Sequence, residues 1–127
     1  MIEFLIVGIG GFIGCCIRFA ITKLFLQLPL QFPLATLISN VIAGFFIGFI
    51  TELEKNSASI SPKTKLFLTT GMMGGLSTFS TFSLETLNLF SKSKYFLALG
   101  NIMLNISLSF LGVILGMVTA KILFLRT

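Results

Sequence analysis

The sequence predicts an all-α membrane protein, a single domain of four transmembrane helices. Of its 127 residues, 55% are hydrophobic and only 10% are charged, whereas a soluble domain of this size carries many more charges. Long apolar segments are separated by short polar ones, and the alternation typical of a transmembrane β-barrel is not visible. Because backbone groups in lipid must be hydrogen-bonded within the protein, helices are the remaining choice.

A transmembrane helix needs about 20 mostly apolar residues, and four segments are candidates. The first, residues 3–26, has no basic segment before it and is longer than the apolar part of a signal peptide, so we expect a mature helix. The second, residues 33–50, follows the break QLPLQFP. The polar run TELEKNSASISPKTK separates it from the third, residues 66–90, and SKSK separates that from the fourth, residues 95–125.

The basic residues are nearly balanced between the two sides of such a protein. Four spans place both chain ends and the 51–65 loop on one side, with five Lys or Arg residues against four on the other. The five are Lys55, Lys63, Lys65, Lys121 and Arg126, and the four are Arg18, Lys23, Lys92 and Lys94. Because an excess of these residues normally sets orientation, we expect insertion both ways up and an antiparallel homodimer. The net charge of +5 is thus shared by two faces and predicts no nucleic-acid partner.

Small and polar residues recur at helical spacing within three spans. They are Gly10, Gly14 and Arg18, then Thr36, Asn40, Gly44 and Gly48, and finally Asn101, Asn105 and Ser109 with Gly112 and Gly116. For the glycines we expect close helix packing. For Asn40, packing and a place on a polar path are both open, because a buried carboxamide without partners is costly.

Two charged residues lie within the spans. Arg18 is late in the first span, where it either extends its side chain to the interface or forms an electropositive vestibule for an anion. Glu85 is the only acidic residue well inside a span, four residues after Thr81 and eight after Ser77. It is either functional or a hydrogen-bonded structural group.

The third span is interrupted by the stretch GMMGGLSTFSTF. Gly74 and Gly75, followed by Leu76, Ser77 and Thr78, form a weak helix-forming run, so we expect the helix to break within it and expose backbone groups that can bind ions. Beyond the run, Phe79 and Phe82 lie on one helical face among hydroxyl side chains. Aromatic ring edges are electropositive, so this pair suits a small anion that must also be released. Ordinary packing is the alternative.

Together these motifs resemble the Fluc (CrcB) fluoride channels, small bacterial and archaeal proteins that export fluoride passively. GGFIGCCIRF resembles the pattern of the first helix, ATLISNVIAGFFIG that of the second, and GMMGGLSTFSTFSLET the most specific signature of the family. The resemblance implies an antiparallel, dual-topology homodimer in the plasma membrane, with two separate fluoride pores. Its partners are then fluoride, the lipid bilayer and a second copy of the chain.

The resemblance also implies pore residues. Phe79 and Phe82 are the expected ring-edge pair, Asn40 the neighbouring amide, and Ser80 and Thr81 the hydroxyls along the path.

The same resemblance places Arg18 near the aqueous vestibule and Glu85 beyond the second ring. It implies that backbone carbonyls of Gly74 and Ser77 from both copies hold a central sodium ion, which is structural and is not transported. Ser77 replaces a frequent Thr, a change that a backbone ligand tolerates.

Other classes remain open at this point. A proton-coupled small multidrug exporter has a similar architecture but needs a mid-membrane carboxylate in its first helix, and Glu3 is at the very end of that span. A non-transporting assembly subunit would account for the small residues but not for the break and its Phe and hydroxyl run. An enzyme is not expected, because the chain has no His, no metal-ligand cluster and no nucleophile paired with a base. A pair of related chains acting as a heterodimer is compatible with the sequence, although the balanced charges favour a homodimer.

Overall fold

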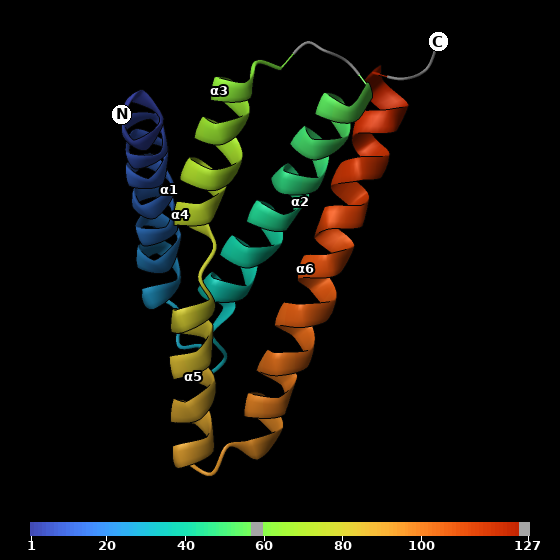
Figure 1. Ribbon diagram of the computed structural model, residues 1–127. Coiled ribbons are helices and arrows are strands. Elements are labelled where there is room, and N and C mark those ends of the chain that lie inside the picture. The colour runs from blue at the N-terminus through green and yellow to red at the C-terminus, as the bar shows by residue number, and fades with distance from the viewer. Residues whose placement is uncertain (57–59, 125–127) are drawn as a thin grey trace.

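The computed structural model describes residues 1–56 and 60–124, and in these ranges it contains helices and no strand (Figure 1). The three long helices are α1 (Ile2–Leu26), α2 (Leu34–Asn56) and α6 (Tyr95–Phe124). Between α2 and α6 lie four shorter elements: α3 (Pro62–Lys65), the π-helix η1 (Leu66–Met73), α4 (Gly74–Leu76) and α5 (Phe79–Ser91).

Three of the described helices, α1, α2 and α6, are long and apolar enough to cross a membrane. The predicted bounds of the first span agree with α1 to within one residue, and the fourth span begins at Tyr95 as expected. Its expected end, Leu125, lies outside the described residues, as does Arg126 of the charge count. The second helix continues beyond the predicted end at residue 50 as far as Asn56.

The third predicted span is divided rather than continuous. The helix that begins at Pro62 ends at Leu76, the chain is extended at Ser77 and Thr78, and α5 begins at Phe79. The 13 residues of α5 correspond to about 20 Å of helix, which is shorter than the roughly 30 Å hydrocarbon core. The break is therefore present, whereas a count of four complete spans stays a prediction.

The break lies within the predicted run, at its last two residues, Ser77 and Thr78, and not at the two glycines that begin it. Gly74 and Gly75 are helical. A Cβ on Gly75 would lie 2.5 Å from the carbonyl oxygen of Gly11, so the glycine is required by the close approach of α4 to α1. Weak helix propensity is a small effect, and packing overrides it here.

Glycines line the two closest helix contacts, in which α1 packs against η1 and α4, and α2 packs along α6. A Cβ on Gly14 would lie 2.0 Å from the carbonyl oxygen of Met72, and one on Gly116 would lie 2.0 Å from that of Phe45. Small residues let backbones approach in this way. The packing interpretation of the glycine stripes is confirmed.

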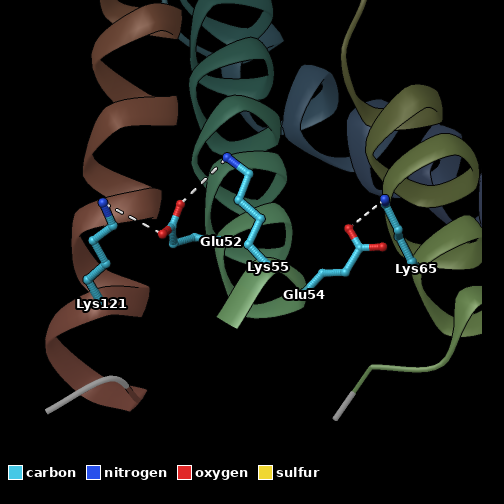
Figure 2. Close-up of polar contacts among 5 residues, drawn as sticks. All are labelled: Glu52, Glu54, Lys55, Lys65 and Lys121. Atoms are coloured by element: carbon cyan, nitrogen blue, oxygen red, sulfur yellow. Dashed lines mark ion pairs between the residues drawn. The ribbon is translucent and has the colours of Figure 1, made fainter. Parts of the chain in front are cut away.

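Figure 1 shows α1 beginning, α2 ending and α3 beginning at the same end of the bundle, with the α5–α6 turn at the other. At the first end, Glu52 is nearly buried and forms ion pairs with Lys55 at 3.9 Å and Lys121 at 3.6 Å (Figure 2). Glu54 pairs with Lys65. These pairs join α2 to α6 and α2 to α3.

Candidate functional site

The extended backbone at the break is held by a side chain of α2. Asn40 Oδ1 accepts a hydrogen bond from the N–H of Thr78 at 2.8 Å, and Asn40 Nδ2 donates to the carbonyl oxygen of Thr78 at 3.4 Å. Thr78 in turn caps α5, because its Oγ1 accepts from the N–H of Thr81 at 3.2 Å. Since a buried unpaired peptide group is costly, these bonds explain how the chain can leave the helix inside the bundle.

The carbonyls of Gly74 and Ser77 are among the backbone groups that lose their helical donors at this point. In a continuous helix the N–H of Thr78 would bond to the carbonyl of Gly74, and that of Thr81 to the carbonyl of Ser77. Asn40 Oδ1 and Thr78 Oγ1 take these donors instead. Gly74 is also exposed on the surface of the single chain. Neutral oxygens released at a helix break are the type of ligand that a hard cation such as sodium accepts, so these residues fit the ion that the sequence led us to expect.

A groove of about 320 Å³ opens beside the break, between α2, α5 and α6. Phe79, Phe82 and Asn40 all line it, so the structure brings these three predicted residues together. The ring centroids of Phe79 and Phe82 are 5.5 Å apart, with an interplanar angle of 52°. Phe82 is 9% exposed and Phe79 is 80% exposed, so in a single chain only the second ring is enclosed.

Thr78 also lines a second groove of about 400 Å³, on the side of the break that faces α1. Arg18 and Thr81 both line this groove, so the structure places them together but separates them from the ring pair. The guanidinium of Arg18 is within 3.6 Å of the sulfur of Cys15. Arg18 thus places a permanent positive charge in a groove that four threonines also line, an arrangement suited to attracting an anion.

Glu85 lies farther along α5. Its Oε1 accepts a hydrogen bond from Thr36 Oγ1 at 2.8 Å, and its Oε2 is buried with no hydrogen-bond partner among the described residues. Thr36 lines the groove of Arg18, whereas Glu85 lines a pocket of about 370 Å³ with Lys92 and Lys94 at the α5–α6 turn. The Thr36 and Glu85 pair therefore lies between these two hollows.

Ser80 lines none of these three hollows and lies on the exposed face of α5, with its hydroxyl 3.4 Å from that of Thr78. Sequence reasoning missed the contacts that organise the site. The four-residue spacing of Thr36 and Asn40 is visible in the sequence, but their partners Glu85 and Thr78 are 49 and 38 positions away. No local pattern reveals pairs so distant.

The sequence profile of one family, described as CrcB-like protein, Camphor Resistance (CrcB), matches residues 5–117. This chain belongs to the CrcB family.

Curated relatives match almost the whole chain. The Fluoride-specific ion channel FluC of Clostridium novyi (strain NT) is 47% identical over 121 residues, which cover 94% of each chain. The protein of the same name from Clostridium perfringens (strain 13 / Type A) is 48% identical with the same coverage. That from Francisella tularensis subsp. tularensis (strain SCHU S4 / Schu 4) is 40% identical over 88% of this chain and 89% of the relative.

These findings place the CrcB-family chain in the cell membrane as a multi-pass protein. The relatives are named as ion channels, which agrees with the expectation that the chain is not an enzyme.

Proposed function

We propose that this chain forms a fluoride-selective channel through which fluoride leaves the cell passively. The observation that carries the proposal is the placement of Phe79 and Phe82 on one groove directly beside the helix break. The names of the relatives, which align over nearly the full length, support the same ion.

The chemistry of the groove suits a small anion that must move on. The positive edges of aromatic rings attract an anion without the full charge of a Lys or Arg side chain. Conduction needs sites that are strong enough for entry and weak enough for release. In the proposed path Asn40 supplies the amide beside the rings, and Glu85 lies beyond the second ring. Thr81 and Arg18, on the second groove, would supply a hydroxyl and the charge of the vestibule, and the exposed Ser80 would supply another hydroxyl.

The functional unit in this proposal is an antiparallel homodimer with two pores. Phe79 is 80% exposed in the single chain, and a pore ring needs a second wall. A second copy of opposite orientation would supply it, and an isologous interface would form two such walls at once. The near balance of Lys and Arg between the two ends supports both orientations.

The same dimer would place the break of one copy opposite the break of the other. We propose that the carbonyls of Gly74 and Ser77 from both copies then hold a structural sodium ion. The support is that both carbonyls lose their helical donors in each chain, since Thr78 and Thr81 donate elsewhere. When bound, the ion would contribute positive charge that holds the two breaks together, and it is not part of the transport path.

The proposal is tested by anion efflux from liposomes that contain the purified protein. Internal fluoride or chloride is followed with an ion-selective electrode after a potassium shunt is added. Rapid fluoride loss with chloride retained is the expected result. Equal loss of both ions would contradict selectivity. If well-folded protein releases no fluoride, the homodimeric channel is wrong, and co-expression with a related chain would test a heterodimer.

A further inference from the structure

A continuous row of hydrogen bonds runs behind the ring pair and connects α2, α5 and α6. It begins at the backbone N–H of Thr78 and ends at the backbone carbonyl of Phe82. The side chains between these ends are, in order, Asn40, Asn105, Asn101 and Thr86. The successive donor-to-acceptor distances are 2.8, 2.9, 2.8, 2.9 and 2.8 Å.

The two ends of the row determine the orientation of every amide in it. A backbone N–H can only donate, so Asn40 must turn Oδ1 toward Thr78 and Nδ2 toward Asn105. A backbone carbonyl can only accept, so the hydroxyl of Thr86 must donate to Phe82 and accept from Asn101. The bond between the two must then run from Asn105 Nδ2 to Asn101 Oδ1, because Asn105 Oδ1 accepts from Asn40 and Asn101 Nδ2 donates to Thr86. The assignment of oxygen and nitrogen follows from the row as a whole.

Burial makes the members of the row depend on one another. Asn101 is 0% exposed, Asn105 5% and Thr86 6%, so water cannot readily replace a lost partner. Asn105 Nδ2 also donates to the carbonyl oxygen of Asn101 at 3.1 Å. In a low-dielectric interior such bonds strengthen one another, and a partly satisfied network is costly.

We infer that Asn101, Asn105 and Thr86 are positioning residues that set the geometry of the ring pair. The row anchors the first turn of α5 at two backbone points, Thr78 before the rings and the carbonyl of Phe82 itself. Both points are connected through the row to α6, Thr78 by way of Asn40 and Asn105, and Phe82 by way of Thr86 and Asn101. The Phe82 ring therefore keeps a fixed position on its groove. Asn101 acts through its neighbours and does not touch the anion. This inference rests on the proposed function for its effect on selectivity, but not for its effect on backbone stability.

The decisive experiment compares two changes at the end of the row. Thr86→Val keeps the shape but removes the hydroxyl, whereas Thr86→Ser keeps the hydroxyl. Thr119→Val is the matched control, because the Thr119 hydroxyl bonds only to a carbonyl of its own helix, that of Leu115. Amide hydrogen exchange in residues 78–86 is measured on the purified protein. We expect Thr86→Val to raise exchange by about tenfold or more, and the other two variants to stay within about twofold of the wild type.

Selectivity supplies the second readout. If the row positions the rings, Thr86→Val lowers the ratio of fluoride to chloride efflux by about tenfold, and Thr86→Ser restores it. A Thr86→Val variant with wild-type exchange and wild-type selectivity would overturn the inference. Asn101→Leu interrupts the middle of the row and must give the same result, so it replaces Thr86→Val if that variant does not assemble.

The two proposals fail in different ways. Wild-type protein that releases no fluoride contradicts the channel, while the exchange measurement still decides whether the row holds the break. Normal fluoride efflux with no change in exchange for Thr86→Val and Asn101→Leu contradicts the row alone.

Discussion

Phe79 and Phe82 differ sharply in their surroundings although they are three residues apart. One is 80% exposed and the other 9% exposed, yet their ring centroids are 5.5 Å apart. The spacing in the sequence is sufficient to predict that the two rings share a face. It cannot predict which ring is enclosed, because that depends on α2 and α6, which come from distant parts of the chain.

Replacing the enclosed ring separates a role in conduction from one in packing. Phe82→Ile keeps an apolar side chain on the groove but removes the electropositive ring edge, so fluoride efflux should fall by about tenfold or more. The dimer should still assemble, as size-exclusion chromatography would show. Phe12→Ile on the exposed face of α1 is the control and should leave efflux unchanged. Wild-type efflux from an assembled Phe82→Ile protein would contradict the ring-edge role.

At the scale of helices, the glycines show what the sequence predicts well and what it does not. Their spacing of four residues predicts close packing, and the structure places Gly14 and Gly116 against neighbouring backbone. Low helix propensity predicts a break within the run from Gly74 to Thr78 but not at which residue. The packing of α4 on α1 keeps Gly74 and Gly75 helical, and the break lies at Ser77 and Thr78. Propensity is a local property, whereas the break depends on Asn40, which belongs to another helix.

Two glycines of α6 give a matched test of this packing. A Cβ on Gly116 would lie 2.0 Å from the carbonyl oxygen of Phe45, whereas the nearest atom to a Cβ on Gly100 is 4.0 Å away. Gly116→Ala should therefore lower the free energy of unfolding by about 1–3 kcal/mol, because rigid backbones must separate. Gly100→Ala should be neutral or stabilising by up to about 1 kcal/mol, because alanine favours a helix. Thermal unfolding in one detergent measures both, and equal effects would contradict close α2–α6 packing at Gly116.

The ion pairs at the end of α2 give a second test between helices. Glu52 is nearly buried between Lys55 and Lys121, whereas the side chain of Glu54 is 37% exposed beside Lys65 (Figure 2). Glu52→Gln should cost about 1–2 kcal/mol, between the values for exposed and buried pairs. Glu54→Gln should cost less than about 1 kcal/mol. A larger loss for Glu54→Gln in the same unfolding assay would contradict this order.

At the scale of the whole molecule, composition is enough to predict the class, and the motifs are enough to predict the family, because both depend on the sequence itself. The assembly of two copies cannot be predicted in the same way. An interface between two copies depends on surfaces that meet in space, and the exposed Gly74 and Phe79 show only that a single chain leaves these surfaces open. The orientation of each copy in the membrane, by contrast, can be measured and altered whichever residues form that interface.

The last prediction concerns this orientation. The side that carries Lys92 and Lys94 has four basic residues against five on the other. Leu28→Lys and Ser91→Lys, both at exposed positions, bring that side from four to six. An excess in short loops directs that side to the cytoplasm, so the double variant should insert mainly one way.

Paired reporters fused to the end of the chain, one active only in the cytoplasm and one only outside, measure this orientation. The wild type should activate both reporters, and the double variant should activate mainly the external one. The variant alone should then lose fluoride efflux, because copies of a single orientation cannot form an antiparallel pair. Co-expression with a variant that carries added lysines on the opposite side should restore efflux. A wild type that activates one reporter alone would contradict dual topology, and full efflux from a variant of single orientation would contradict the antiparallel dimer.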